Sequence, residues 1–284
     1  MTTVAGRDGV CEDLMGWLSI YQQRIGVTFP SSEPTVSDLN RLTLAHIQAF
    51  PFEMLDYFLD TAPTVDLDII RQKFLLECRG GGCSQQNALF AEALRFLGVR
   101  CHYGMARVPR EDGRPSPRAH MILFLEYRGH TNWLCDVGYG MGGPLYPLRM
   151  DLGVVQKQGC HEFRIVAADA QFLALERYSQ ERWKRLYVFD LRHYDLQDFE
   201  PANYFNTLSP KSIFTRNLIV SRPTLEGGVL IRNRNFIFWD GEEYRKEAIQ
   251  SLDHLVYLLQ SQFLIRVEPL DFVNLPTMFR RMAS

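Results

Sequence analysis

Three consecutive glycines, Gly80 to Gly82, stand directly before Cys83. Apolar residues recur at helical spacing from Cys83 onward, which predicts that the cysteine begins a helix. There the sulfur faces unpaired N–H groups and the positive end of the helix dipole, an environment that favours the thiolate. Glycines allow close approach of the backbone to a substrate and positive φ angles. The segment indicates a nucleophilic cysteine; the alternative is a buried cysteine after a glycine-rich connection.

A thiolate nucleophile requires a base nearby, and the base requires an acceptor that orients it. Among the seven histidines, His120 begins the first of two neighbouring strand patterns, over residues 120–127 and 133–137. Asp136 lies in the second pattern. We therefore take His120 as the candidate base and Asp136 as its partner, against the alternative of an ordinary strand-end histidine and a turn residue.

The length of the turn between these strands decides whether the two side chains can meet. If residues 128–130 form a three-residue turn, Asp136 is a diagonal neighbour of His120 on the same face, at roughly 7–8 Å between backbones. A two-residue turn places them on opposite faces. On the first register, Cys83, His120 and Asp136 form an activated-thiol triad, in the chain order of papain-like and transglutaminase-like enzymes.

The elements that must position these side chains follow a simple order. Helical spacing marks four segments in the first hundred residues, 14–21, 39–50, 67–76 and 83–97. Ser37 is expected to cap the second helix and Gly98 to end the fourth. Strand patterns then cover residues 120–127, 133–137, 161–167, 172–178, 183–189, 229–232 and 235–239, before helical spacing returns at 252–259. This order predicts an α+β fold rather than an alternating βαβ sheet.

The composition excludes several classes of protein. The chain has 284 residues, which favours about two domains. With 31 Lys and Arg against 33 Asp and Glu, it offers no basis for binding nucleic acid. No apolar run approaches the ~20 residues of a membrane helix, so no membrane partner is expected. Six cysteines without regular spacing, and no visible signal in residues 1–9, predict reduced thiols in the cytoplasm.

Two further arrangements of cysteine are weaker hypotheses. Cys78, Cys83 and the neighbours Cys101 and His102 could ligate zinc, but structural zinc sites favour cysteine pairs about two to four residues apart. Cys101 and Arg107 have the spacing of a cysteine-phosphatase loop, yet this segment has a strand pattern rather than that of an anion-binding loop. We therefore expect no metal site and no phosphatase loop.

Motifs spread from about residue 18 to residue 239 form one larger pattern. They are Arg24-Ile25-Gly26, His46, PFEMLD at 51–56, RGGGC at 79–83, Gln85, Asn87, LGV at 97–99, ARV at 106–108, DVGYG at 136–140, Trp183, Tyr187, Phe189, Asn203 and PKSIF at 210–214. This pattern resembles the arylamine N-acetyltransferase family. The chain departs from it at four positions outside the candidate triad, which are Met54, Ser84, Gln85 and Ala119.

The resemblance implies a fold of three parts around a cysteine-protease-like or transglutaminase-like catalytic core. These parts are an N-terminal helical domain over residues 1–100, an antiparallel β-barrel over 101–205 and a C-terminal α/β lid over 206–284. It also implies a ping-pong reaction. Cys83 would take an acetyl group from acetyl-CoA and pass it to an arylamine or hydrazine, with His120 as the base and Asp136 as its orienting partner.

The resemblance also suggests binding residues. Phe52 and Tyr139 match positions that line the acceptor pocket, where aromatic walls suit a flat apolar amine. Ser212 and Phe214 fall in the family's segment near the coenzyme A channel, and Phe214 is counted among the substrate-binding residues. Coenzyme A carries phosphates, so the backbone N–H groups of Gly138 to Gly143 are candidate contacts. The residues assigned to coenzyme A are Gly138, Gly140 and Ser212. Arg79 is expected to form a structural ion pair with Glu53.

Other activities are compatible with the same triad. The donor could be a different acyl-CoA. Water could resolve the thioester, giving a thioesterase, or an internal amine could do so, giving an amide synthase. A ligand-binding protein that retains an inactive fold is the non-enzymatic alternative, and the three intact catalytic residue types argue against it.

Overall fold

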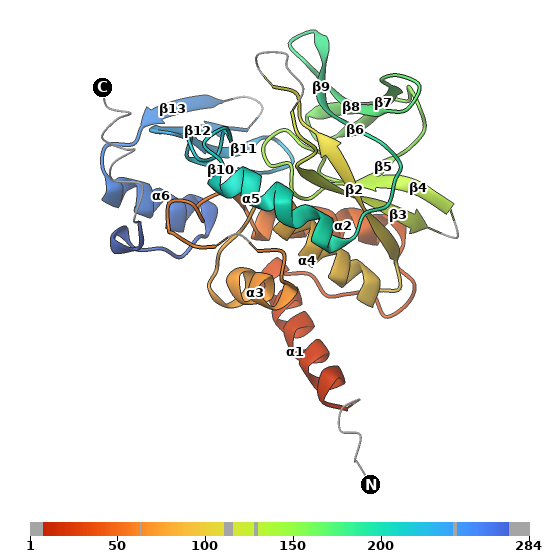
Figure 1. Cartoon of the computed structure of the whole chain (residues 1–284), viewed down its shortest axis with the longest axis horizontal. Coiled ribbons are helices and arrows are strands. Elements are labelled where there is room, and N and C mark those ends of the chain that lie inside the picture. Colours follow the sequence, from red (N-terminus) through yellow and green to blue (C-terminus); the bar gives the residue numbers. More distant parts are fainter. Residues whose placement is uncertain (1–7, 63, 111–115, 128–129, 241–242, 273–284) are drawn as a thin grey trace.

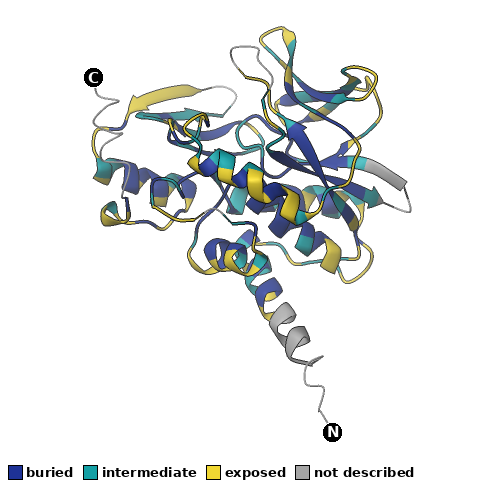
Figure 2. Ribbon diagram, in the orientation of Figure 1, coloured by how far each residue is buried: buried dark blue, intermediate teal, exposed yellow. Residues whose placement is uncertain are grey.

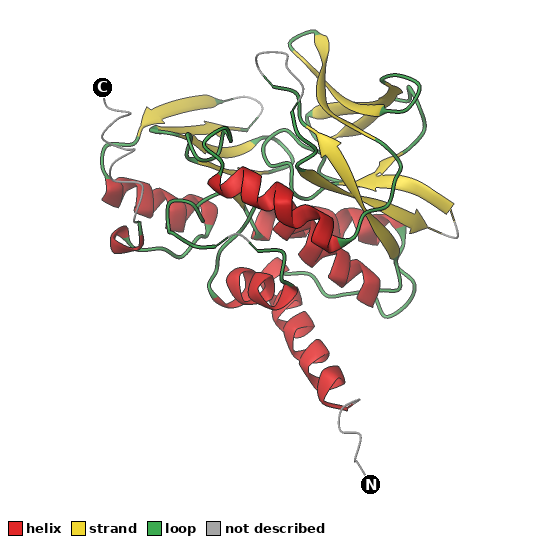
Figure 3. Ribbon diagram, in the orientation of Figure 1, coloured by secondary structure: helices red, strands yellow, loops and turns green. Residues whose placement is uncertain are grey.

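The computed structural model describes residues 8–62, 64–110, 116–127, 130–240 and 243–272 (Figure 1). Helices lie below, and a β-barrel and a smaller sheet lie side by side above them (Figures 1 and 3). This arrangement confirms the α+β prediction with its helical, barrel and C-terminal α/β regions. The predicted turn residues Arg128 and Gly129, and most of the N-terminal segment expected to lack a signal, lie outside the described residues.

The N-terminal region contains the four predicted helical segments. They are α1 (Asp8–Ile25), α2 (Val36–Ala49), α3 (Leu67–Arg71), which continues as the π-helical η1 (Gln72–Leu76), and α4 (Cys83–Phe96). The expected cap at Ser37 was wrong. Thr35 caps α2 instead, because its side-chain oxygen accepts the N–H of Asp38 while the Asp38 carboxylate accepts the N–H of Thr35. Gly98 follows α4 with a φ of +76°, the conformation expected of a glycine that ends a helix.

Eight antiparallel strands form the nearly closed barrel. Their bounds are β2 (Arg100–Arg107), β3 (His120–Tyr127), β4 (His130–Cys135), β5 (Leu148–Arg149), β6 (Gln156–Gln158), β7 (His161–Ala167), β8 (Leu173–Ser179) and β9 (Arg182–Phe189). The order is β5-β4-β3-β2-β9-β8-β7-β6, which leaves β5 and β6 as edges. The side chain of Gln156 joins these edges, because its amide bonds both the N–H and the carbonyl of Arg149 at 2.8 Å.

The β3–β4 hairpin has a shorter turn than predicted, yet it still places His120 and Asp136 on the same face. Near the turn, Tyr127 pairs with His130, so two residues rather than three separate the strands. That register alone would place His120 and Asp136 on opposite faces. A β-bulge after Leu125 shifts the pairing by one residue, so that Leu125 faces Trp133 and Leu123 faces Cys135. The bulge thus restores the register predicted from a three-residue turn.

The C-terminal region is built on a five-stranded antiparallel sheet of order β1-β10-β11-β12-β13. Its strands are β1 (Phe52–Glu53), β10 (Ile219–Pro223), β11 (Gly228–Arg232), β12 (Asn235–Trp239) and β13 (Tyr244–Ala248). Helix α6 (Leu252–Phe263) packs against it, and the short helix η3 (Pro269–Asp271) follows. Strand β1 comes from the N-terminal region, so this sheet holds segments far apart in the sequence.

Helix α5 (Glu200–Leu208), preceded by η2 (Leu196–Phe199), lies across the middle of the molecule in Figure 1. Its outer face is exposed (Figure 2), whereas Asn203 and Thr207 are buried. The amide of Asn206 donates to the carbonyl of Ala119 at 3.0 Å. This helix therefore contacts the residue before the candidate base.

Strand β3 is buried on both faces, which explains its continuous apolar run. Met121, Leu123 and Leu125 pack with the helices, and Ile122 and Phe124 point into the barrel core. His120 lies on the side of the even-numbered residues, at the end of the strand. No helix within the described ranges is long and apolar enough to cross a bilayer.

Candidate active site

Cys83 is the first residue of α4, and Gly82 is its N-cap. The sulfur is partly exposed and lies 3.6 Å from the carbonyl oxygen of Ala119. The preceding glycines do not have positive φ angles, which corrects that part of the prediction. Space is the reason for them: a Cβ at Gly80 would lie 1.9 Å from the Pro51 carbonyl oxygen, and one at Gly81 would lie 2.4 Å from the Gln85 amide oxygen.

The structure brings His120 and Asp136 together. His120 Nε2 lies 2.7 Å from Asp136 Oδ2, and both residues are buried. The other oxygen of Asp136 accepts the N–H of Gly138 at 2.9 Å. Because Nε2 is engaged, Nδ1 is the ring nitrogen left for the sulfur of Cys83. The imidazole is therefore held between a carboxylate and a thiol, an arrangement that suits an orienter, a base and a nucleophile.

Three effects set the protonation of His120. Burial by itself would lower its pKa, but the negative charge of Asp136, that of Cys83 and hydrogen bonds to both raise the pKa to about 10. The imidazole therefore holds its proton through neutral pH. A protonated imidazole beside sulfur stabilises the thiolate, which is the reactive form of cysteine.

Aromatic rings enclose this cluster. The rings of Tyr139 and Tyr187 lie 5.7 and 5.2 Å from the His120 ring, between centroids. Burial raises the pKa of Tyr139 to about 12 and that of Tyr187 well above its ordinary value, so both phenols stay neutral. Tyr187 belongs to the sequence motifs but was not predicted to lie at the site. Alternation along β9 gives no signal for it, because Leu186 and Tyr187 are adjacent and both are buried in the barrel core.

The residues predicted to bind the acceptor lie close together. The rings of Phe52 and Phe214 are 5.9 Å apart. Gly140 abuts Phe52 with a φ of +82°, and a Cβ there would lie 2.6 Å from Ser221 Oγ and 3.2 Å from Phe52 Cβ. Together with Tyr139, these rings supply aromatic surface next to the cluster.

Two residues assigned to coenzyme A have other bonds within the chain. The N–H of Gly138 donates to Asp136, and a Cβ at Gly138 would lie 2.6 Å from Cys83 Cα. The hydroxyl of Ser212 donates to the Asn206 carbonyl at 2.7 Å and accepts the N–H of Phe214 at 3.1 Å. Gly138 thus helps to orient Asp136, and Ser212 links Asn206 to Phe214. A contact with coenzyme A stays a prediction for both residues.

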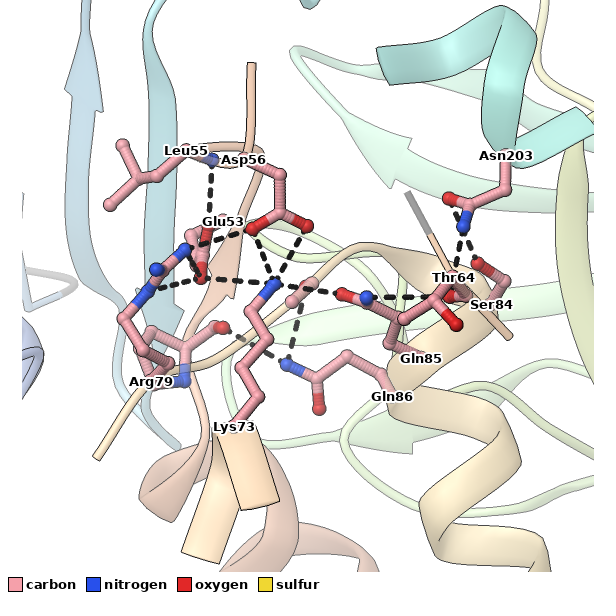
Figure 4. Close-up of polar contacts among 12 residues, drawn as sticks. Glu53, Leu55, Asp56, Thr64, Lys73, Arg79, Ser84, Gln85, Gln86 and Asn203 are labelled. Carbon is pink, nitrogen blue, oxygen red and sulfur yellow. Dashed lines mark hydrogen bonds and ion pairs between the residues drawn. The ribbon is translucent and has the colours of Figure 1, made fainter. Parts of the chain in front are cut away.

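A buried cluster of four charges supports the glycine-rich segment (Figure 4). Arg79 bonds Glu53 Oε1 at 2.6 Å, the predicted pair, and also Asp56 at 3.1 Å. Lys73 Nζ lies 2.7 Å from Asp56 and 3.0 Å from the amide oxygen of Gln85. Burial alone would raise the pKa of Asp56, but the charges of Lys73 and Arg79 hold it below its usual value. The cluster therefore links the segment of Glu53 and Asp56 both to η1 and to Arg79, which begins the glycine-rich segment before Cys83.

We expect Lys73→Met to destabilise the protein by about 3–5 kcal/mol, because it removes one partner of a buried ion cluster. The free energy of unfolding in urea measures the loss. Arg41→Ala is the matched control, since the Arg41–Asp38 pair is on the surface and should contribute at most about 1 kcal/mol. Equal losses for both variants would contradict a structural role for the cluster.

No group of three or more His, Cys, Asp or Glu side chains suited to hold a metal ion occurs within the part of the chain that the structure describes.

The fold and sequence fit a family model described as N-acetyltransferase, which matches residues 35–272. The arylamine N-acetyltransferase / N-hydroxyarylamine O-acetyltransferase of Salmonella typhimurium is 32% identical over 238 residues, covering 82% of this chain and 84% of that protein. The solved structure of arylamine N-acetyltransferase from that organism superposes with a TM-score of 0.85 at 27% identity, covering 93% of this chain and 98% of that one.

A second solved structure, Mycobacterium marinum arylamine N-acetyltransferase in complex with CoA, gives a TM-score of 0.80 at 25% identity. It covers 92% of this chain and 94% of that one. The chain belongs to the arylamine N-acetyltransferase family and is an acyltransferase of that family.

Proposed function

We propose that the protein transfers an acetyl group from acetyl-CoA to an arylamine or hydrazine through a thioester on Cys83. The observation that carries the proposal is the buried His120–Asp136 pair at 2.7 Å, with the charge of Cys83 acting on the same imidazole. Membership of the family supports acetyl-CoA as the donor. The structure of the Mycobacterium marinum protein in complex with CoA supports binding of the CoA part of that donor.

The first half-reaction makes the acetyl-enzyme. The Cys83 thiolate attacks the thioester carbonyl of acetyl-CoA, forming a carbon–sulfur bond and a tetrahedral intermediate. When the intermediate collapses, the bond to the sulfur of coenzyme A breaks and the leaving thiolate takes the proton from His120. Asp136 keeps the ring aimed during this transfer.

The second half-reaction passes the acetyl group to the amine. The acceptor nitrogen attacks the thioester on Cys83 while neutral His120 removes a proton from it. The carbon–sulfur bond then breaks, which restores the Cys83 thiolate and the His120 imidazolium. Phe52, Tyr139 and Phe214 suit a flat aromatic acceptor, because aromatic faces pack against its ring.

Release of free CoA tests this function. Purified protein mixed with acetyl-CoA should release thiol slowly, and aniline or phenylhydrazine should accelerate the release with formation of the acetylated amine. Cyclohexylamine is the control for the aromatic acceptor. Equal release without any amine would indicate a thioesterase, and faster release with a longer acyl-CoA would indicate another donor. No release at all would refute the proposal.

A cytoplasmic location belongs to the proposal, since a nucleophilic thiol needs reducing surroundings.

Iodoacetamide should alkylate Cys83 faster than an exposed thiol at pH 6. The His120 pKa of about 10 leaves the imidazole protonated at that pH, and a thiolate beside an imidazolium persists where a free thiol is protonated. Cys160 is the internal comparison, because it is an exposed free thiol outside the triad. Peptide mass spectrometry measures both rates, and His120→Ala should remove the difference. Equal rates in the unsubstituted protein would contradict this account of activation.

A further inference from the structure

The side chain of Asn87 joins the three elements that carry the candidate triad. It lies on α4 one turn after Cys83 and is completely buried. Its Nδ2 lies 2.9 Å from the Met121 carbonyl on β3 and 3.3 Å from Asp136 Oδ1, and 3.1 Å from the carbonyl of Cys83 itself. Its Oδ1 accepts the N–H of Val137 at 3.2 Å. One amide thus contacts the helix of the nucleophile, the strand of the base and the segment of the carboxylate.

These partners fix which way the amide points. All the atoms around Nδ2 are carbonyl or carboxylate oxygens, and the atom facing Oδ1 is an N–H. An amide turned by 180° would oppose oxygen to oxygen and N–H to N–H. Only a side chain of this length with a donor and an acceptor satisfies the position.

The contacts of Asp136 divide between its two oxygens. Oδ2 faces His120, whereas Oδ1 receives the N–H of Gly138 and the amide of Asn87. Two donors on one oxygen hold the plane of the carboxylate and leave the other oxygen for the imidazole. Gly138 makes the approach feasible, because a Cβ there would lie 2.8 Å from Asn87 Nδ2.

We propose that Asn87 is a positioning residue for the transfer reaction: its amide sets the orientation of the Asp136 carboxylate, and through it the distance between the His120 ring and the Cys83 sulfur. The proposal rests on the proposed function. It assigns Asn87 no contact with substrate and no proton transfer.

The titratable groups that face His120 are Asp136, Cys83, Tyr139 and Tyr187. Both tyrosines stay neutral, so the carboxylate and the sulfur supply the charges. Without the amide of Asn87, the carboxylate can turn and the imidazolium can move away from the sulfur. The attraction that stabilises the thiolate then weakens with distance.

The experiment compares Asn87→Ala with Leu94→Ala, a cavity-forming substitution on the same helix in the core. We expect Asn87→Ala to lower kcat for aniline acetylation by about 100-fold while KM for acetyl-CoA changes less than about threefold. We also expect the rate of Cys83 alkylation by iodoacetamide at pH 6 to fall by about tenfold. Leu94→Ala should lower the melting temperature and leave the alkylation rate unchanged. An Asn87→Ala variant that matches Leu94→Ala in kcat and in alkylation rate would overturn the proposal.

Asn87→Asp provides a test that preserves size. A protonated carboxyl can donate one hydrogen bond to Asp136 Oδ1 as the amide does, whereas an ionised one repels it. The ratio of its kcat to that of the unsubstituted protein should therefore rise as the pH falls, and a constant ratio would overturn the proposal. If Asn87→Ala shows no cooperative unfolding, and so is not properly folded, Asn87→Asp serves as the test in its place. Absence of CoA release by the unsubstituted protein would refute the proposed function, while the rates of Cys83 alkylation at pH 6 would still decide the role of Asn87.

Discussion

The Cys83→Ala variant is expected to lose acetyl transfer by about four orders of magnitude or more, because removing the nucleophile of a triad removes the covalent pathway. CoA release from acetyl-CoA should fall to the background rate, with or without aniline. No acetylated Cys83 peptide should be found by mass spectrometry after incubation with acetyl-CoA, whereas the unsubstituted protein should carry one. The thiol is partly exposed at a helix start, so the fold should survive its removal.

Cys160→Ala is the control for this variant. Cys160 is an exposed free thiol that lies outside the triad, and its loss should leave the rate unchanged. Thermal unfolding of both variants should match that of the unsubstituted protein within a few degrees. Acetylation of aniline at an undiminished rate by Cys83→Ala would exclude the thioester mechanism.

The Asp136→Asn variant is expected to lower kcat by about three to four orders of magnitude. The amide keeps the size of the carboxylate but removes one of the two negative charges that, with the hydrogen bonds to both groups, raise the pKa of His120 to about 10. Its NH₂ group can also donate to His120 Nε2. That contact favours the tautomer with the ring proton on Nδ1, the nitrogen left for the Cys83 sulfur. The pKa of His120 should therefore fall, and the advantage of Cys83 in alkylation at pH 6 should disappear with it.

Asp151→Asn is the matched control, because Asp151 pairs with Arg149 on the surface of the barrel. It should leave both kcat and the alkylation rate of Cys83 unchanged. If Asp136→Asn retained more than about a tenth of the activity, orientation of His120 by Asp136 would not limit the reaction.

The sequence predicts those elements whose own residues carry an apolar period. Strands β3, β7 and β12 occur at the predicted residues, and α4 begins at the predicted one. Helix α5 was missed because its buried residues, Asn203 and Thr207, are polar, whereas its apolar residues Tyr204 and Leu208 are exposed. Strand β13 was missed because all its residues are exposed, as suits a charged edge strand. In β10, the run Ser221-Arg222-Pro223 conceals the pattern.

The candidate triad could be found from the sequence, although one step of its derivation was wrong. Turn length alone would have separated His120 from Asp136, and the bulge after Leu125 brings them back to one face. A bulge inside a hydrophobic strand has no signature in single-residue patterns. Asn87 appeared only as part of a motif, because its role depends on three segments that meet in space. The proposed domain boundaries stay predictions.

Strand β1 has only two residues, yet it connects distant parts of the chain. Phe52 pairs with Ser221 of β10 on one side and forms a parallel bridge with Gly81 on the other, two residues before the nucleophile. A protein cut after the barrel would keep every triad residue but lose the partner of this strand and the ring of Phe214. We therefore expect fragments that stop short of β10 to make poor starting points for engineering, although they contain every triad residue.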